Sequence, residues 1–487
     1  MQGALFLAAL GLPLLTGVVL CLFRDREGPG PGRFALLATA LSSVLVWTLI
    51  LQAGEEPHIL LRFTDSLTFC LRFDGLGRYF AGILASLWPL TVIYAQAYLE
   101  GKPRLGSFFG FFTLSYAMSL GVSMAGNLFS LYVFYEMLTL ATAPLVLYPM
   151  SPRALRATRS YLVFSLGGAA FGFAAMTWLL SVGAGGYFSL GGLLPGKVDE
   201  NTGRLFFLLC FLGFGVKAAV FPLHVWLPRA TVAPTPVTAL LHAVAVVKAG
   251  AFAVIRLSWF CFDPARLRGS WGQMLALGLC CFTLLFGSVM ALKQVHWKKR
   301  MAYSTVANLS YILFGVLLLI PAGLQAGLIH MAAHAAIKIL TFFCAGAVYC
   351  RTGIEYHTEL GGLGRKMPVT FACYSLGALA LTGIPPLYGF VSKWHLLTAA
   401  AEADTAVAYA GIGALLISAL LTAIYMLVPA VRAWFPRQGG ENPRLDSFRE
   451  ADWRMTLPHI LLALAVLTLG LYAQPVVAAA ARIAGLR

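Results

Sequence analysis

The sequence is poor in charged residues, and poorest in acidic ones. Asp, Glu, Lys and Arg make up 11% of the 487 residues, and only 19 residues are acidic. A typical soluble domain has about 25% charged residues, whereas 59% of this chain is hydrophobic. No stretch between the apolar runs is long enough for a soluble domain. The composition therefore predicts a single membrane domain over residues 1–487.

Cofactor-binding patterns are also missing. The nine cysteines form no CxxC pair, and most of them, including Cys280 and Cys281, lie in apolar runs. Gly-rich pieces such as GAGG and GFG neither follow a strand nor open a phosphate-binding helix, so they do not indicate nucleotide binding. We therefore expect no iron–sulfur cluster, zinc site, disulfide framework or other cofactor in this chain.

Basic residues exceed acidic ones, with a formal net charge of +16. They are spread over short loops without interleaved aromatic residues, so nucleic acid is not an expected partner. When the apolar runs are numbered along the chain as membrane spans, the loops after the odd-numbered spans carry more Lys and Arg than the loops after the even-numbered ones. This predicts that the former loops are cytoplasmic and that both termini face outward. The heaviest clusters are residues 298–300 and the loop from Arg432 to Arg454. Either they only fix the topology or they also dock a partner protein.

Apolar runs close to the ~20 residues that cross a bilayer recur along the whole chain. They predict an all-α polytopic membrane protein of fourteen spans, at about residues 3–23, 34–53, 75–98, 106–124, 127–149, 160–183, 205–221, 235–258, 272–292, 303–320, 323–349, 368–398, 407–431 and 457–480. We expect the first three spans within residues 1–100, five spans each within 101–258 and 270–432, and a basic cytoplasmic loop and the last span within 433–487.

Residues 211–255 contain the strongest functional signal. Lys217 lies inside an apolar span, and His242 and Lys248 lie in the next one. The chain between and at the edges of these spans is interrupted by Pro222, Pro228, Pro234 and Pro236. A lysine at the bilayer centre costs roughly 2.5–3.5 kcal/mol, and irregular backbone at that depth must be satisfied by protein or water. The stretch therefore predicts an ion site.

Glu136 is the single acid in the span formed by residues 127–148. A lone intramembrane carboxylate is a functional hypothesis by default, and we expect Lys217 to be its partner. Opposite charges favour each other's ionised form, so a pair that forms and breaks would switch the proton affinity of the lysine. The alternative is a static structural ion pair.

The eleventh span carries His330, His334 and Lys338 at positions i, i+4 and i+8. This spacing places them along one helix face, which suits protons that hop between side chains and water. Histidine titrates near neutrality, as a relay requires. A zinc site at the two histidines lacks further ligands and the nearby Glu of a metalloprotease, so we expect no metal.

The twelfth span is the second interrupted helix. Its breaking residues are Gly383, Pro385, Pro386 and Gly389, and Lys393 follows them. Two interrupted helices with embedded lysines, five spans apart, predict two inverted five-helix repeats, spans 4–8 and 9–13, with discontinuous helices 7 and 12.

Seven ordered motifs resemble the antiporter-like subunits shared by respiratory complex I (NADH:quinone oxidoreductase), membrane-bound hydrogenases and Mrp-type sodium/proton antiporters. They are NLFSLYVFYEMLTL, GFGVKAAVFPLHVWLPRA, APTPVTALLHAVAVVKAG, KKRMAYSTVANLS, HMAAHAAIKIL, LGGLGRKMP and TGIPPLYGFVSK. The resemblance covers spans 3 to 13 and implies a fourteen-helix fold. The implied proton-translocating residues are Glu136, Lys217, Lys248, His330, His334, Lys338 and Lys393. Supporting roles are expected for His242, Pro222, Pro236, Pro385 and Pro386.

Three positions depart from the family pattern. Many members have histidine where this chain has Thr231, and aspartate where it has Gly126. The glutamate-bearing branch of the family has an acid at the position of Lys393. The chain also ends soon after its last span, without the long lateral helix of the distal complex I subunit, which argues against a strictly distal position.

The resemblance implies a proton-translocating subunit in the inner membrane of a bacterial or archaeal cell, without redox chemistry of its own. Expected partners are further antiporter-like membrane subunits and hydrophilic redox subunits of an iron–sulfur, hydrogenase-like or quinone-reductase module. The main alternative is a subunit of an Mrp-type sodium/proton antiporter. A structural subunit with a degenerate channel conflicts with the complete set of ionisable residues, and no extra polar cluster supports a solute permease.

Overall fold

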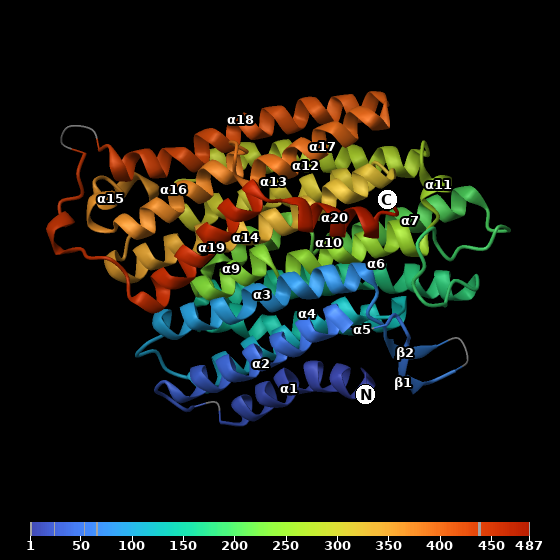
Figure 1. Cartoon of the computed structure of the whole chain (residues 1–487), viewed down its shortest axis with the longest axis horizontal. Helices are drawn as coiled ribbons and strands as arrows, with labels where there is room; N and C mark the ends of the chain where they lie inside the picture. Colours follow the sequence, from blue (N-terminus) through green and yellow to red (C-terminus); the bar gives the residue numbers. More distant parts are fainter. Residues whose placement is uncertain (1, 24, 53, 65–66, 437–439, 487) are drawn as a thin grey trace.

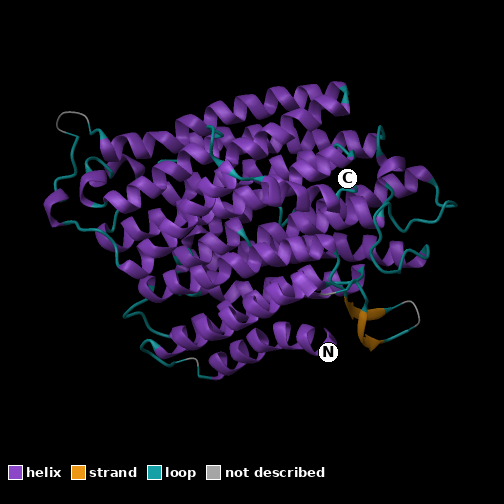
Figure 2. Cartoon of the chain, in the orientation of Figure 1, coloured by secondary structure: helices purple, strands orange, loops and turns teal. Residues whose placement is uncertain are grey.

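The computed structural model describes residues 2–23, 25–52, 54–64, 67–436 and 440–486. Residues 437–439 of the basic loop lie outside this range. Nearly all of the described secondary structure is helical (Figure 2), and the long helices lie side by side in one bundle (Figure 1). Both termini lie at the same end of the bundle, at right in Figure 1. We refer to the opposite end, which carries the loops after the odd-numbered spans, as the basic end.

The bounds of the elements follow the predicted order of spans. The first group of helices is α1 (Gln2–Leu22), α2 (Gly30–Gln52), α3 (Gly75–Tyr98), α4 (Leu105–Met124), α5 (Leu128–Leu147), α6 (Pro152–Ser181) and α7 (Glu200–Gly215). The interrupted middle region is η1 (Leu223–Val225), α8 (Trp226–Arg229), η2 (Ala230–Val232), α9 (Thr235–Ala243), α10 (Val246–Arg256), the π-helical turn η3 (Leu257–Cys261) and α11 (Pro264–Leu267).

The second half repeats long helices with one interruption. Its elements are α12 (Trp271–Lys293), α13 (Trp297–Leu317), α14 (Pro321–Thr352), η4 (His357–Glu359), α15 (Leu363–Lys366), α16 (Pro368–Thr382), α17 (Tyr388–Ala403), α18 (Ala406–Trp434), η5 (Leu445–Ser447), α19 (Trp453–Leu471) and α20 (Gln474–Ile483). The centre of the bundle is formed by α14, whose most apolar window is 94% buried, and by the segment Thr235–Cys261, which is 100% buried. In outer helices such as α1, α2 and α6, only 39% of the residues in the most apolar stretch are buried.

The chain is a polytopic membrane protein. In the described parts of the chain, 11 helical segments are long and apolar enough to cross a membrane, with α9, α10 and η3 counted together as one. Three predicted spans are not among them: α7 with its interrupted continuation, α13, and the pair α16 and α17. Helices α7, α16 and α17 have 16, 15 and 16 residues, shorter than the ~20 that cross a bilayer.

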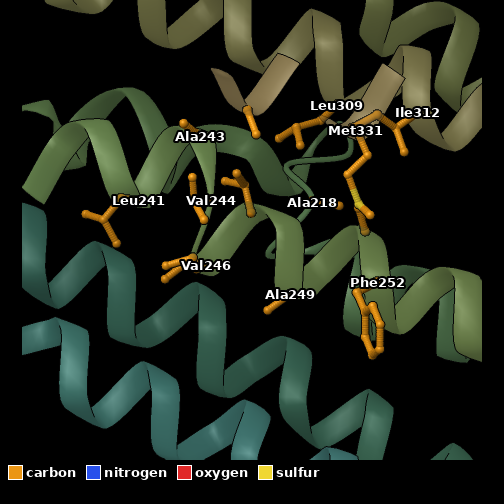
Figure 3. Packing of buried hydrophobic residues seen from close by; sticks show 14 of the residues in the cluster. Ala218, Leu241, Ala243, Val244, Val246, Ala249, Phe252, Leu309, Ile312 and Met331 are labelled. Atoms are coloured by element: carbon orange, nitrogen blue, oxygen red, sulfur yellow. The ribbon is translucent and has the colours of Figure 1, made fainter. Parts of the chain in front are cut away.

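The span predicted at residues 235–258 is present as one segment long enough to cross a membrane, but it consists of two helices, α9 and α10. The helix breaks at Val244 and Ala245, where the amides of both residues donate to the Leu240 carbonyl, at 3.0 and 2.8 Å. Figure 3 shows Val244 at this break and Val246 at the start of the next helix. Neither proline nor glycine occurs at the break, so the sequence carries no local signal for it. The last predicted span differs too, because α19 ends at Leu471 and α20 is a separate helix.

A β-hairpin at the end of the bundle near the termini was not predicted. Strands β1 (His58–Arg62) and β2 (Thr68–Leu71) pair antiparallel, and β2 continues onto the junction of α4 and α5. The Gly126 amide donates to the Cys70 carbonyl at 3.1 Å. A Cβ atom at Gly126 would lie 2.9 Å from the Cys70 Sγ. The strand therefore leaves no room for the aspartate that many family members carry at this position.

Prolines inside two helices free carbonyl groups that buried side chains then satisfy. Proline has no amide hydrogen, so Pro13 in α1 leaves the Ala9 carbonyl free, and Ser42 donates to it at 2.7 Å. Pro429 in α18 likewise leaves the Tyr425 carbonyl free, and Arg300 donates to it at 3.0 Å. Arg300 therefore has a structural role inside the bundle.

Candidate functional site

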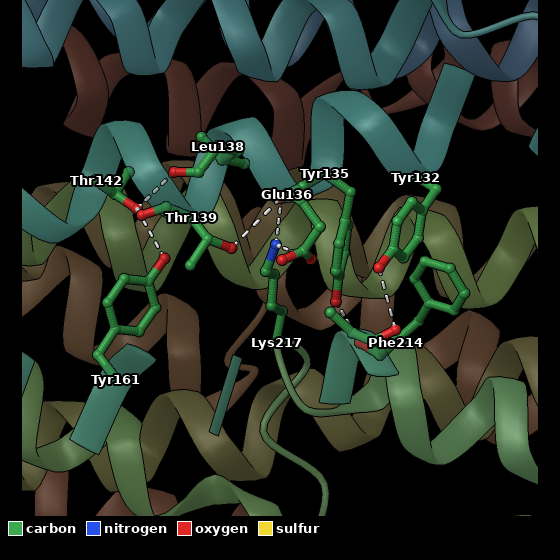
Figure 4. A network of polar contacts seen from close by, with 10 residues as sticks. Tyr132, Tyr135, Glu136, Leu138, Thr139, Thr142, Tyr161, Phe214 and Lys217 are labelled. Atoms are coloured by element: carbon green, nitrogen blue, oxygen red, sulfur yellow. Dashed lines mark hydrogen bonds and ion pairs between the residues drawn. The ribbon is translucent and has the colours of Figure 1, made fainter. Parts of the chain in front are cut away.

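Lys217 and Glu136 come together next to the first helix interruption. Helix α7 ends at Gly215, which places Lys217 in the unwound segment before η1. Its Nζ lies 3.4 Å from the Glu136 Oε1, donates to the Tyr135 carbonyl, and lies 3.3 Å from the centre of the Tyr135 ring (Figure 4). The Lys217 side chain is 1% exposed. The expected pairing is thus present in the structure.

The surroundings of Glu136 are asymmetric. Its side chain is 17% exposed, and the neighbouring Met137 and Leu140 are exposed on the outer face of α5. Its second oxygen, Oε2, is shielded and has no hydrogen-bond partner in the part of the chain that the structure describes. Hydroxyl groups of Thr142 and Tyr161, 2.7 Å apart, lie nearby in Figure 4. Only one of the two carboxylate oxygens of Glu136 therefore engages the lysine.

Lys248 forms the second centre, in the first turn of α10 just after the break. Its Nζ lies 2.5 Å from the Nδ1 of His334 on α14, and both side chains are fully buried. An ammonium group donates to an unprotonated imidazole nitrogen, and the proton can rest on either atom. The other ring nitrogen of His334 has no partner among the described residues. This arrangement is suited to proton exchange.

The two centres are connected by a close backbone approach at Gly250. A Cβ atom at this position would lie 2.4 Å from the Ala218 amide nitrogen and 2.7 Å from the Lys217 carbonyl carbon. Figure 3 shows Ala218 beside α10. Helix α10 thus packs directly against the unwound segment that carries Lys217, and only glycine allows this.

The three side chains His330, His334 and Lys338 on α14 do not all point in the same direction. The rings of His330 and His334 are 6.2 Å apart, and the His330 Nδ1 lies 3.0 Å from the Ser392 Oγ on α17. Lys338 instead donates to the Met301 carbonyl on α13 at 3.1 Å. Each step of four residues turns the direction of the side chain by about 40°. After two steps the third member therefore faces another helix, and His330, not Lys338, lies nearest to α17.

Lys393 lies on α17, next to Ser392, and closes the second helix interruption. Its Nζ donates to the carbonyls of Leu381 and Thr382 at 2.8 and 2.9 Å. These are carbonyls at the C-terminal end of α16, where partial negative charge favours a cation. Gly383 ends α16 with a φ of +95°, which favours glycine.

The supporting residues lie at the interruptions. Pro222 precedes η1, Pro236 lies in the first turn of α9, and Pro385 and Pro386 separate α16 from α17. His242 is fully buried near the end of α9, with its ring 5.1 Å from that of Phe342. Both of its ring nitrogens lack hydrogen-bond partners within the described ranges.

A cavity of about 1620 Å³ opens at the basic end. Its cationic lining residues are Lys102, Arg104, Arg153, Arg156, Arg229, Lys298, Lys299 and Arg351. Its acidic ones are Glu100, Glu355 and Asp452. The wall also includes Thr231 and Pro234, directly before α9. We call this cavity the basic vestibule. It lies beside the start of the broken segment that leads to His242 and Lys248.

A second polar cluster at the basic end joins His357 to two arginines. The His357 Nε2 lies 2.8 Å from the Arg300 Nη2, and its Nδ1 lies 3.1 Å from the Arg432 Nη1. Burial, followed by the charges of Arg300 and Arg432, lowers the pKa of His357 from 6.5 to about 4. The imidazole is therefore neutral in the folded protein at neutral pH.

This cluster predicts a loss of stability in mild acid. His357 takes up a proton near pH 6.5 in the unfolded chain, but only near pH 4 in the folded protein. The stability contributed by the neutral imidazole is therefore complete above pH 6.5 and is lost as the pH falls toward 4. At pH 5 we expect on the order of 1–2 kcal/mol less stability than at pH 8. Thermal unfolding in detergent at both pH values measures this.

His357→Gln, which keeps a hydrogen-bonding side chain but does not titrate, should flatten the dependence. His58→Gln, a control in the hairpin, should not. An unchanged slope in His357→Gln would show that this ring is not the responsible group.

The sequence interpretation missed a buried ion pair. Asp74, before α3, and Arg256, at the end of α10, form two hydrogen bonds of 2.5 and 2.6 Å. Arg256 ends the apolar run AGAFAVI, so the rule that singled out Lys217 applies equally to it. In the described chain no three His, Cys, Asp or Glu side chains gather as metal ligands.

Interrupted helices around buried amines and imidazoles define a polytopic membrane protein with an ionisable centre. The family model described as "NADH:quinone oxidoreductase/Mrp antiporter, TM" matches residues 125–422, and the chain belongs to this family. It is an antiporter-like membrane subunit.

Individual relatives come from two kinds of complex. The chain is 33% identical to NADH-quinone oxidoreductase subunit N of Desulforudis audaxviator, over 84% of this chain and 83% of that protein. It is 34% identical to an Na(+)/H(+) antiporter subunit of Alkalihalophilus pseudofirmus, over 68% of this chain. The match spans only 43% of that antiporter protein, and 58% of the NAD(P)H-quinone oxidoreductase chain 5 of Synechocystis sp., which is 30% identical.

Solved structures show the same fold. A chain of the membrane-bound sulfane sulfur reductase, an archaeal respiratory membrane complex, superposes with a TM-score of 0.87 at 22% identity, covering 100% of this chain and 97% of that one. A chain of the Mrp complex from Dietzia sp. superposes with a TM-score of 0.83 at 21% identity, covering 99% and 97%. At these identities the likeness concerns the fold alone.

Proposed function

We propose that this chain translocates protons in a complex whose other subunits transfer electrons, and that it carries no redox chemistry itself. The observation that carries the proposal is the 2.5 Å contact between the Lys248 Nζ and the His334 Nδ1 in the centre of the bundle. Burying an amine against an imidazole costs free energy, and packing alone does not require it. Intramembrane ionisable groups of this kind serve ion pathways.

In the proposed cycle, Glu136 controls Lys217 by pairing with it or leaving it. Lys217 then exchanges a proton with Lys248, and His334 and His330 pass it toward Lys393. Moving one charge against 100 mV costs about 2.3 kcal/mol, and a change of two pKa units in a lysine supplies roughly 2.7 kcal/mol. The switching of one pair is therefore sufficient in principle. Lys338 extends the set toward α13.

The basic vestibule supports this cycle as a source of water. Its wall includes Pro234, one residue before α9, and α9 carries the buried His242. We propose that protons reach the central residues along this broken segment. The vestibule lies among the loops that the positive-inside rule assigns to the cytoplasm, so both termini would face outward.

We further propose a single membrane domain of fourteen spans. The 11 clear spans would be completed by the interrupted α7, by α13 and by the interrupted pair α16 and α17. Two inverted five-helix units would occupy residues 101–258 and 270–432, each with its broken helix, flanked by residues 1–100 and 433–487. The complex would lie in the inner membrane of a bacterial or archaeal cell.

The proposed partners are other antiporter-like membrane subunits and hydrophilic redox subunits, of an iron–sulfur, hydrogenase-like or quinone-reductase kind. The similarity to a subunit of NADH-quinone oxidoreductase over 84% of the chain supports such an assembly. The similarity to the Na(+)/H(+) antiporter protein favours the alternative, an Mrp-type antiporter. A site rich in lysine and histidine with one carboxylate favours protons over sodium, since hard cations prefer several oxygen ligands.

The test is to purify the native complex through a tag on this chain, identify its partners, and measure proton uptake in vesicles. We expect redox subunits to copurify, and donor oxidation to drive uptake that Lys217→Ala abolishes. If only small membrane subunits copurify and a sodium gradient alone moves protons, the chain belongs to an antiporter instead.

A further inference from the structure

The buried pair of Asp74 and Arg256 takes no part in the proposed proton steps, but its surroundings hold the guanidinium in one specific orientation. Arg256 is fully buried, and the Asp74 side chain is 11% exposed. The Arg256 Cζ lies 4.8 to 5.0 Å from the rings of Phe188, Phe252 and Phe260. Such a site gives the guanidinium both a bidentate acceptor and an aromatic surround, which fixes its direction as well as its charge.

Helix α10 needs an anchor at this end. It begins at the break, where no side chain caps it, and Lys248 lies in its first turn. Arg256 is its last residue, about 12 Å further along the axis. Asp74 in turn caps α3, accepting from the Gly77 amide at 2.9 Å. The far end of α10 is therefore tied by side-chain hydrogen bonds to a rigid helix start, whereas its near end has no side-chain cap.

We propose that the Asp74–Arg256 pair is a positioning element that fixes the rotation and height of α10, and thereby holds Lys248 against His334. This inference rests on the proposed function, because it takes the contact between Lys248 and His334 as a proton-transfer step. Rotation by a single residue position would turn Lys248 by about 100°. Two parallel hydrogen bonds at the far end oppose such a rotation, whereas a single point charge does not.

The test compares Arg256→Lys with Arg204→Lys in the whole complex. Both substitutions keep the charge and remove a guanidinium that bonds a carboxylate, but Arg204 is only partly buried and pairs with the exposed Glu200. For Arg256→Lys we expect about tenfold faster hydrogen exchange in residues 246–256. We also expect the midpoint of the pH profile of proton uptake to move by about one unit. Arg204→Lys should change neither.

The two readouts separate the possible failures. Faster exchange with an unchanged pH profile would mean that the pair only stabilises the fold, and the positioning role would be wrong. Unchanged exchange in α10 would also overturn it. Hydrogen exchange does not depend on transport, so if Lys248→Ala left proton uptake normal, the proposed function would fail independently of this measurement. If Arg256→Lys does not assemble, Asp74→Glu, which keeps both charges but displaces the carboxylate by one methylene, provides the same two measurements.

Discussion

Lys248→Ala is expected to abolish proton uptake by the assembled complex while leaving its assembly intact. The Lys248 Nζ lies 2.5 Å from the His334 Nδ1, and no other amine contacts that imidazole in the described chain. Removing the amine therefore removes one side of the transfer. Proton transfer by a positioned group contributes typically 10²–10⁴-fold, so we expect a loss of about a hundredfold or more. Uptake by vesicles, normalised to complex content, measures it.

The matched control is Lys197→Ala, the same change at an exposed loop position. It should leave uptake unchanged. Lys248→Arg adds a sharper distinction, because arginine keeps the positive charge but does not release its proton. A relay should fail with arginine, whereas a static structural cation should tolerate it. Normal uptake in Lys248→Arg would show that this residue does not carry the proton.

The interruptions that contain proline or glycine could be predicted, and the one without them could not. Pro222 and the Pro385–Pro386 pair mark the interruptions that follow α7 and α16, because proline cannot continue a helix, although α7 itself already ends at Gly215. The break at Val244 has no such residue. The helix that follows it packs against the Lys217 segment at Gly250, and a contact between distant segments leaves no local pattern. That break is what places Lys248 at the start of a separate short helix.

The same distinction between local sequence signals and contacts among distant segments applies to the site residues. An ionisable side chain within an apolar run is visible in the sequence, and this identified Lys217, Lys248 and Lys393. The contacts that these side chains make depend on the arrangement of the helices. Lys338 shares a helix with His334 but bonds α13, because three side chains at four-residue steps drift around the helix. The basic vestibule is formed by loops from several separate segments, so no single stretch reveals it.

The Gly250→Ala substitution is expected to lower both stability and transport, although replacing glycine by alanine in a helix usually stabilises it. Alanine is favoured over glycine in a helix by about 1 kcal/mol. Here, however, the new Cβ would lie 2.4 Å from the Ala218 amide nitrogen and 2.7 Å from the Lys217 carbonyl carbon. Backbone atoms cannot rotate away as side chains do. Overpacking of this kind costs about 1–3 kcal/mol, so the net effect should be destabilising.

The control is Gly278→Ala on α12, where a Cβ would have no atom within 4 Å. This change should be neutral or slightly stabilising by thermal unfolding, and transport should not change. In Gly250→Ala, α10 has to move away from the Lys217 segment, which separates the two proton centres. Transport should therefore fall further than the loss of stability alone explains. If transport stayed normal in a destabilised protein, the close approach at Gly250 would serve packing only, and protons would not need to cross from Lys217 to Lys248 at this contact.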